Sequence, residues 1–142
     1  MDPQTIAERV GTDMLAQDEA SRGLGMAVEA MAPGLARLGM TVRADMLNGF
    51  KICHGGFIAL LADSAFAFAC NSRNHLTVAA GFAVDFLLPA HEGDRLTAEA
   101  REVSLSGRSG IYDVTVINQR GETVAVLRGR SHRMRDRSTV PL

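Results

Sequence analysis

The feature that most constrains the fold of this chain is an apolar run in its middle, from Phe57 to Cys70. Nearly every position is apolar and most are good helix formers, so the resulting helix has no polar face and must be covered on all sides. The run is too short to span a bilayer, and it carries one charge near its middle, Asp63. It therefore predicts a core helix rather than a membrane span.

Two places on this helix carry groups suited to a reaction site. His54-Gly55-Gly56 stands where the helix begins, and bare N–H groups at that end, with the positive end of the helix dipole, favour a developing negative charge. Asp63 is costly to bury as an ion without partners, so it should be either hydrogen-bonded or functional. A simple turn at the glycines and a hydrogen-bonded structural Asp63 are the alternatives.

The spacing of these groups carries further information. Gly55 and Asp63 are eight residues apart, which at ~1.5 Å per residue separates them by roughly 12 Å along the helix axis. One Asp side chain cannot close that gap. If both groups act on the same substrate atom, the acid must come from a second copy of the helix lying alongside, so the spacing suggests a dimer with shared sites.

The rest of the chain reads as one N-terminal helix and several strands. Asp2 as cap and Pro3 in the first turn predict a short amphipathic helix that reaches Met14. Extended runs are predicted at 23–31, 35–44, 77–88, 95–105, 111–118 and 122–132. Short connections favour antiparallel neighbours, so we predict an α+β fold in which a sheet curls around the central helix. Residues 1–142 then form a single domain, with a core at about 23–133 and a frayed tail from about 136.

Composition and motifs argue against several classes of protein. The formal net charge of -1 gives no electrostatic support for nucleic-acid binding. Two cysteines and no apolar leader at the N-terminus fit a reduced, cytoplasmic setting. The histidines show no paired ligand spacing, and the chain has no C-x-x-C, Walker or dinucleotide motif. We therefore expect no metal site and no bound redox cofactor.

One set of residues resembles a known family. Asn48, His54-Gly55-Gly56 and Asp63 are followed by Asp85-Phe-Leu-Leu-Pro89 and by Gly129-Arg-Ser-His-Arg133. This set resembles the hotdog-fold acyl-CoA thioesterases of the PaaI type, which act in bacterial phenylacetate degradation, over most of the chain. The resemblance implies a hotdog fold whose protomers pair edge to edge with their central helices side by side. It also implies a homodimer with shared sites that pairs further as a dimer of dimers, a homotetramer.

The resemblance suggests roles for four residues. The N–H of Gly55 would polarise the thioester carbonyl, as backbone donors do in oxyanion holes. Asp63 would act across the dimer interface, either as a nucleophile that forms a mixed anhydride or as a general base on water. His54 would orient the carbonyl or hold the loop. Asn48 would contact the thioester or position water, although Asn48-Gly49 is also an ordinary turn signal.

The expected substrate is an aryl-acetyl-CoA ester of the phenylacetyl or hydroxyphenylacetyl type, with coenzyme A as part of the substrate. Gly56 is a further candidate for substrate binding. Arg108, Arg130 and Arg133 are candidates for the coenzyme A phosphates from their charge, with plain solvation as the alternative. Two rival functions remain: a non-catalytic acyl-CoA-binding or regulatory module, and a hotdog dehydratase or isomerase.

Overall fold

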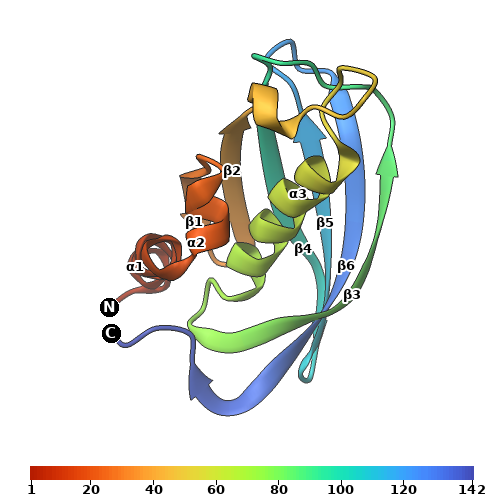
Figure 1. The fold of residues 1–142 in the computed structure, drawn as a ribbon. Coiled ribbons are helices and arrows are strands. Elements are labelled where there is room, and N and C mark those ends of the chain that lie inside the picture. Colours follow the sequence, from red (N-terminus) through yellow and green to blue (C-terminus); the bar gives the residue numbers. More distant parts are fainter.

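Helix α3, Gly55–Cys70, lies in the concave side of a single curved sheet (Figure 1). The structure is a computed structural model that describes all residues from Met1 to Leu142. Its strands are β1 (Ala27–Ala32), β2 (Leu35–Thr41), β3 (His75–Phe86), β4 (Arg95–Ser106), β5 (Ser109–Ile117) and β6 (Thr123–Ser138). They form one antiparallel sheet in the order β1-β2-β4-β5-β6-β3. The predicted α+β fold, a curved sheet around one central helix, is confirmed.

The inner face of α3 forms the centre of the core. Leu61, Ala65 and Phe66 on this face are fully buried. A side chain at Gly129 of β6 would place its Cβ only 2.7 Å from the Phe66 ring, so the glycine lets the helix lie close to the sheet. Phe66 also packs against the Tyr112 ring of β5, with ring centroids 5.6 Å apart. No helix in the structure is both long enough and apolar enough to cross a membrane.

The opposite face of α3 is only partly covered. Asp63, Ala67 and Cys70 on this face are half-buried. The sequence predicts a helix covered on all sides, and a single chain leaves this one face incomplete. An apolar helical face left half-open in one chain is suited to packing against another protein surface.

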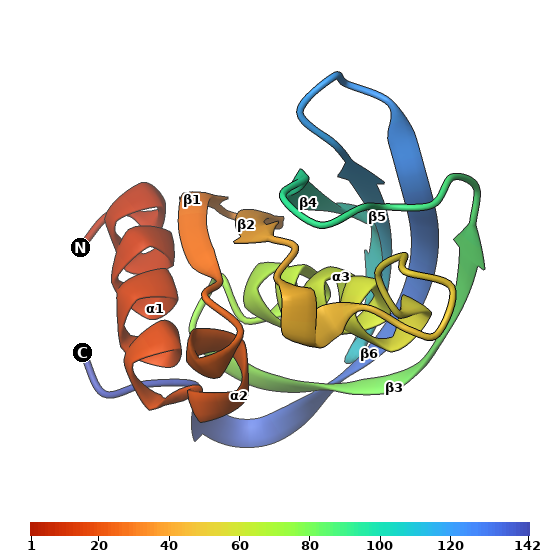
Figure 2. The same cartoon turned by 45° about the horizontal axis from the view of Figure 1, so that its top comes forward.

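The two edges of the sheet differ. Helix α1 (Pro3–Gln17) lies along β1 (Figure 2), and the Gln4 side chain donates a hydrogen bond to the carbonyl oxygen of Met31 at 2.7 Å. At the other edge, β3 has no neighbour beyond β6. Phe82 and Phe86 of β3 point to the concave face, opposite Gly129 and Ala125, yet they are 45% and 52% exposed. One edge is therefore protected within the chain, and the other is open and apolar.

A second short helix replaces part of a predicted strand. The sequence predicts an extended run at 23–31, but α2 (Glu19–Gly23) occupies its start and β1 begins only at Ala27. The carboxylate of Asp18 caps α2 by accepting a hydrogen bond from the Ser21 N–H at 2.9 Å. The Ser21 hydroxyl also meets that of Ser64 on α3 at 2.9 Å. Ser21 and Ser64 are 43 positions apart, so the sequence around Ser21 does not reveal this buried contact.

The prediction of a frayed C-terminal tail is wrong. Strand β6 continues to Ser138, and Val140 is only 8% exposed. The Thr139 hydroxyl donates to Oδ1 of Asn71 at 2.7 Å, and the Val140 N–H donates to Oδ1 of Asn74 at 2.9 Å. The tail is ordered because it completes the hydrogen bonds of the turn that follows α3.

Candidate active site

A cavity of about 490 Å³, here called the α3 cavity, opens at the N-terminal end of α3. One wall is formed by the segment from Asn48 to Ile58, and the other by the segment 86–89 at the end of β3. No charged side chain lines it. No three His, Cys, Asp or Glu side chains of the protein come together as metal ligands would. An apolar cavity of this kind suits an acyl or aryl group with a few polar contacts to orient it.

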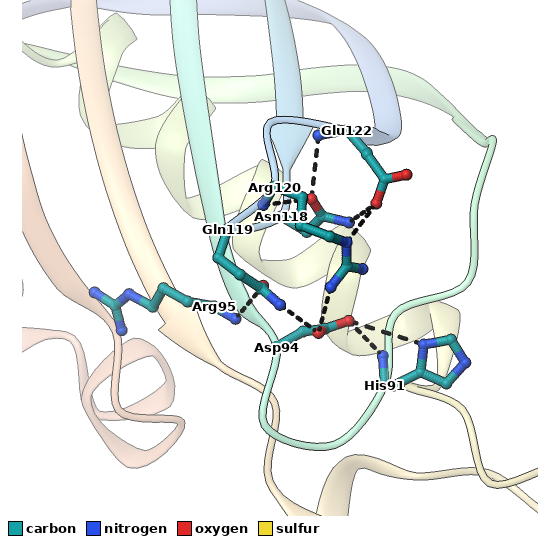
Figure 3. A network of polar contacts seen from close by, with 7 residues as sticks. All are labelled: His91, Asp94, Arg95, Asn118, Gln119, Arg120 and Glu122. Carbon is teal, nitrogen blue, oxygen red and sulfur yellow. Dashed lines mark hydrogen bonds and ion pairs between the residues drawn. The ribbon is translucent and has the colours of Figure 1, made fainter.

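A polar network around the buried Asp94 carboxylate lies next to the second wall (Figure 3). Asp94 accepts hydrogen bonds from the Gln119 side chain at 2.9 Å and from the His91 N–H at 2.8 Å. These bonds, helped by the nearby Arg120 guanidinium, hold the pKa of the Asp94 carboxyl below its usual range. The network ties the turn after Pro89 to the turn between β5 and β6. Sequence reasoning missed Asp94, although a carboxylate that closes a turn is a recognisable local pattern.

The first turn of α3 leaves one backbone donor free. Nδ1 of His54 accepts a hydrogen bond from the Gly56 N–H at 2.9 Å, so His54 is the N-cap of the helix. The Phe57 N–H donates to the His54 carbonyl at 3.0 Å. The Gly55 N–H has no acceptor in the protein. The donor of Gly56, a predicted substrate-binding residue, is therefore already used by His54, and Gly55 carries the free donor at the cavity.

Gly55 also has a steric reason to be glycine. A Cβ at this position would lie 3.0 Å from Cζ of Phe86. A side chain at position 55 would require the Phe86 ring to move by a few tenths of an ångström, so glycine lets the ring lie close to the helix end. The same residue supplies a free N–H and room for an aromatic wall.

Asn48 is oriented by its own turn. Its Oδ1 accepts hydrogen bonds from the Phe50 N–H at 2.9 Å and, more weakly, from the Ile52 N–H at 3.4 Å. Its Nδ2 has no partner, and the residue lines the α3 cavity. The oxygen is thus occupied, and the NH₂ group is available as a donor. Asn48 is a turn residue and a cavity residue at the same time.

Asp63 lies on the half-exposed face of α3 and does not line the cavity of its own chain. Neither a hydrogen bond nor an ion pair engages its carboxylate. Burial raises the pKa of this carboxyl above its ordinary value. The structural alternative for Asp63, a carboxylate held by nearby hydrogen bonds, has no such contact in this chain.

The three arginines proposed for phosphate binding lie away from the α3 cavity. Arg108 is in the hairpin between β4 and β5, where its carbonyl accepts a hydrogen bond from the Arg133 N–H at 2.8 Å. Arg130 pairs with Gly81 in the sheet. This hairpin is at the end of the molecule opposite the N-terminus of α3 (Figure 1). Within one chain, the structure does not bring these arginines together with Asn48 and Gly55.

Comparison with known proteins places this site in a family. The thioesterase superfamily profile matches residues 50–125. The acyl-coenzyme A thioesterase PaaI of Escherichia coli K12 is 45% identical over 121 residues, 85% of this chain and 86% of its own length. The solved structure of the E. coli PaaI protein from the phenylacetic acid degradation operon matches with a TM-score of 0.92 and 41% identity, over 94% of this chain and 96% of that chain. A solved mutant of the phenylacetic acid degradation protein PaaI from Thermus thermophilus matches with a TM-score of 0.79 and 41% identity, over 82% of this chain and 100% of that chain. The chain therefore belongs to the thioesterase superfamily, as a hotdog-fold protein of the PaaI type.

Proposed function

We propose that this protein is an acyl-CoA thioesterase that hydrolyses aryl-acetyl-CoA esters, of the phenylacetyl or hydroxyphenylacetyl type, to the free acid and coenzyme A. Its similarity to the E. coli acyl-coenzyme A thioesterase supports the reaction class. The observation that carries the proposal is one helix bearing both a free N–H at Gly55 and a partnerless carboxylate at Asp63.

The free donors at the cavity suit the thioester carbonyl. When a nucleophile attacks this carbonyl, negative charge develops on its oxygen, and a positioned backbone donor is typically worth ~3 to 4 kcal/mol of the barrier. Gly55 supplies that donor. Asn48 is placed to add a second donor through its free Nδ2, since Oδ1 is occupied within the turn. Asn48 therefore serves as a donor to the substrate rather than as an acceptor for water.

Asp63 is the acid–base or nucleophilic group of the proposal. As a base, its carboxylate takes a proton from water, the water oxygen attacks the carbonyl carbon, and the carbon–sulfur bond breaks to release the thiolate, which takes up a proton. As a nucleophile, it attacks the carbonyl carbon itself, releases the thiolate and leaves a mixed anhydride that water then hydrolyses. Both routes require the ionised carboxylate. The raised pKa of this carboxyl makes it a stronger base than an ordinary aspartate.

The proposal includes a site shared between two copies of the chain. Within one helix, Gly55 and Asp63 are too far apart to meet on one atom. The free apolar edge of β3 and the half-exposed face of α3 lie together on the surface that an isologous two-fold dimer would cover. Asp63 of a second copy would then reach the Gly55 end of the first. We expect these dimers to pair further as a dimer of dimers, to act in the cytoplasm and to need no cofactor beyond the coenzyme A of the substrate.

Thiol release from a panel of CoA esters tests the proposal. The panel contains aromatic, medium-chain and long-chain esters, and free thiol is measured with a thiol-reactive dye. We expect the highest kcat/KM for aryl-acetyl-CoA esters. Palmitoyl-CoA as the best substrate would contradict the aryl preference. Binding of the esters without any thiol release would instead favour a non-catalytic acyl-CoA-binding module.

A further inference from the structure

A turn beside the α3 cavity presents two side chains that the proposed reaction does not use. The segment Asn48–Ile52, here called the Phe50 turn, begins and ends with residues that line the cavity. Its tip carries Phe50, which is 86% exposed, and Lys51, the only lysine of the chain. Because both flanking residues line the cavity, the tip lies at the cavity rim.

The Phe50 turn is well ordered despite this exposure. The Asn48 N–H donates to the Ile52 carbonyl at 2.8 Å, and the Lys51 N–H donates to the Asn48 carbonyl at 3.0 Å. Oδ1 of Asn48 accepts from the Phe50 N–H. Lys51 has a φ of 63°, a backbone conformation that costs a non-glycine residue free energy and that often occurs at functional sites. The turn therefore holds Phe50 in solvent, where the side chain adds nothing to the core.

Lys51 is the unpaired cation of this region. The lining of the cavity is uncharged. Two nearby arginines are already paired: Arg43 with Asp45 at 3.0 Å, and Arg120 with Glu122 at 2.8 Å. Lys51 takes part in no ion pair or side-chain hydrogen bond. A compact ammonium on a flexible stem is suited to pairing with a phosphate.

We propose that the Phe50 turn recognises the coenzyme A part of the substrate, a proposal that rests on the thioesterase function above. With the thioester carbonyl at Gly55, the pantetheine arm leaves the apolar cavity past the turn. Phe50 packs against this arm, and Lys51 pairs with a phosphate beyond it. The phosphate contact thus comes from the cavity rim rather than from Arg108, Arg130 or Arg133 of the same chain, none of which lines the cavity.

Binding of coenzyme A and of pantetheine, which lacks the phosphates, tests the role of Lys51 by calorimetry. Lys51→Gln keeps the length of the side chain and removes its charge, whereas Lys51→Arg keeps the charge. We expect Lys51→Gln to weaken coenzyme A binding about threefold to tenfold, the range for one partly exposed charge-assisted contact. Pantetheine binding should not change, Lys51→Arg should bind coenzyme A as the wild type does, and added salt should reduce the difference.

Arg130→Gln is the matched control, because it removes a cation that lies within β6, opposite Gly81, and does not line the α3 cavity. Normal coenzyme A binding by Lys51→Gln, or a phosphate-specific loss in Arg130→Gln instead, would overturn the assignment of Lys51. Phe50→Ala should weaken coenzyme A and pantetheine alike. A change of oligomeric state with unchanged binding would make Phe50 a subunit contact and reject its role in recognition. Failed thiol release would overturn the proposed reaction alone, since these binding measurements do not depend on turnover.

Discussion

The two ends of helix α3 differ in how fully side chains of the protein pair with their free backbone groups. At the N-terminal end, the Gly55 N–H has no acceptor, and Gly55 lines the α3 cavity. At the C-terminal end, the buried Asn71 side chain donates to the carbonyls of Ala67 at 2.8 Å and Thr77 at 2.9 Å, and its Oδ1 accepts from the Thr77 N–H at 3.0 Å. Helix ends normally need partners for their free groups. The N-terminal end, here called the open end, has a backbone donor without a partner and is therefore the end available to a ligand.

The C-terminal end of α3 with the turn that follows it, residues 70–74, is here called the closed end, and it also connects distant parts of the sheet. The Gly34 N–H, before β2, donates to the Ser72 hydroxyl at 2.8 Å. Glu102 of β4 accepts from the Arg73 guanidinium at 2.6 Å and from the Tyr112 hydroxyl of β5 at 3.2 Å. Stability should therefore depend on the closed end, and activity on the open end and Asp63.

The largest effect is expected at Asp63. Asp63→Asn should lower kcat roughly 100-fold or more, because an amide can neither accept the proton nor attack the carbonyl. The fold should be kept, since the carboxylate makes no hydrogen bond or ion pair within the chain. Steady-state thiol release and circular dichroism check both points. A folded variant with near-normal kcat would make Asp63 a structural residue.

The next largest effect is the recovery of activity in mixed dimers. Gly55→Pro removes the free N–H at the first helical position, where proline is favoured, and His54 has φ -59° and ψ 133°, which a following proline accepts. Gly55→Pro and Asp63→Asn should each be nearly inactive. Refolded together, half of the dimers are mixed and carry one intact site each. Activity should then approach about a quarter of wild type per total site, for an isologous dimer with independent sites.

Gly55→Ala is the control for the proline, because it adds a Cβ beside Phe86 but keeps the N–H. If the loss of the donor is what matters, Gly55→Ala should retain much more activity than Gly55→Pro. Mixed dimers that stay as inactive as their parents would show that Asp63 does not act across the interface.

A stability effect is expected at the closed end. Asn71→Ala removes the partners of two buried backbone groups of Thr77 and should lower the free energy of unfolding by about 2 to 4 kcal/mol. Urea denaturation measures this change. The kcat of the folded variant should stay within about twofold of wild type, since Asn71 is far from the cavity. A large loss of kcat without loss of stability would remove the contrast between the two ends.

The smallest effect concerns pH. Burial raises the pKa of the folded Asp63 carboxyl above its ordinary value of 3.8, so the ionised form destabilises the fold above the folded pKa, and this cost vanishes below the ordinary value. Asp63→Asn should therefore have a higher Tm than wild type at neutral pH, and the gap should close as the pH falls through this window. In wild type, kcat/KM should rise with pH through the raised pKa. An equal Tm difference at every pH would contradict the prediction that burial raises the pKa of the Asp63 carboxyl.

Much of the fold could be predicted from the sequence because its signals are local. The apolar run predicts the helix from Phe57 to Cys70 almost to its ends, and the alternation at Phe82, Val84 and Phe86 indicates the inner face of β3. The distance between Gly55 and Asp63 follows from helix geometry alone. Propensity, period and rise per residue act over a few neighbours, so one chain segment contains the information.

Tertiary structure decided the features that depend on distant partners. The C-terminal tail is held by Asn71 and Asn74, more than sixty residues earlier. The Asp94 network joins two turns whose bonded residues, Asp94 and Gln119, are 25 positions apart in the sequence. That Arg130 lies opposite Gly81 and outside the α3 cavity became visible only with the sheet in place. Each outcome depends on which polar groups meet after folding, and a sequence pattern records the groups without recording their partners.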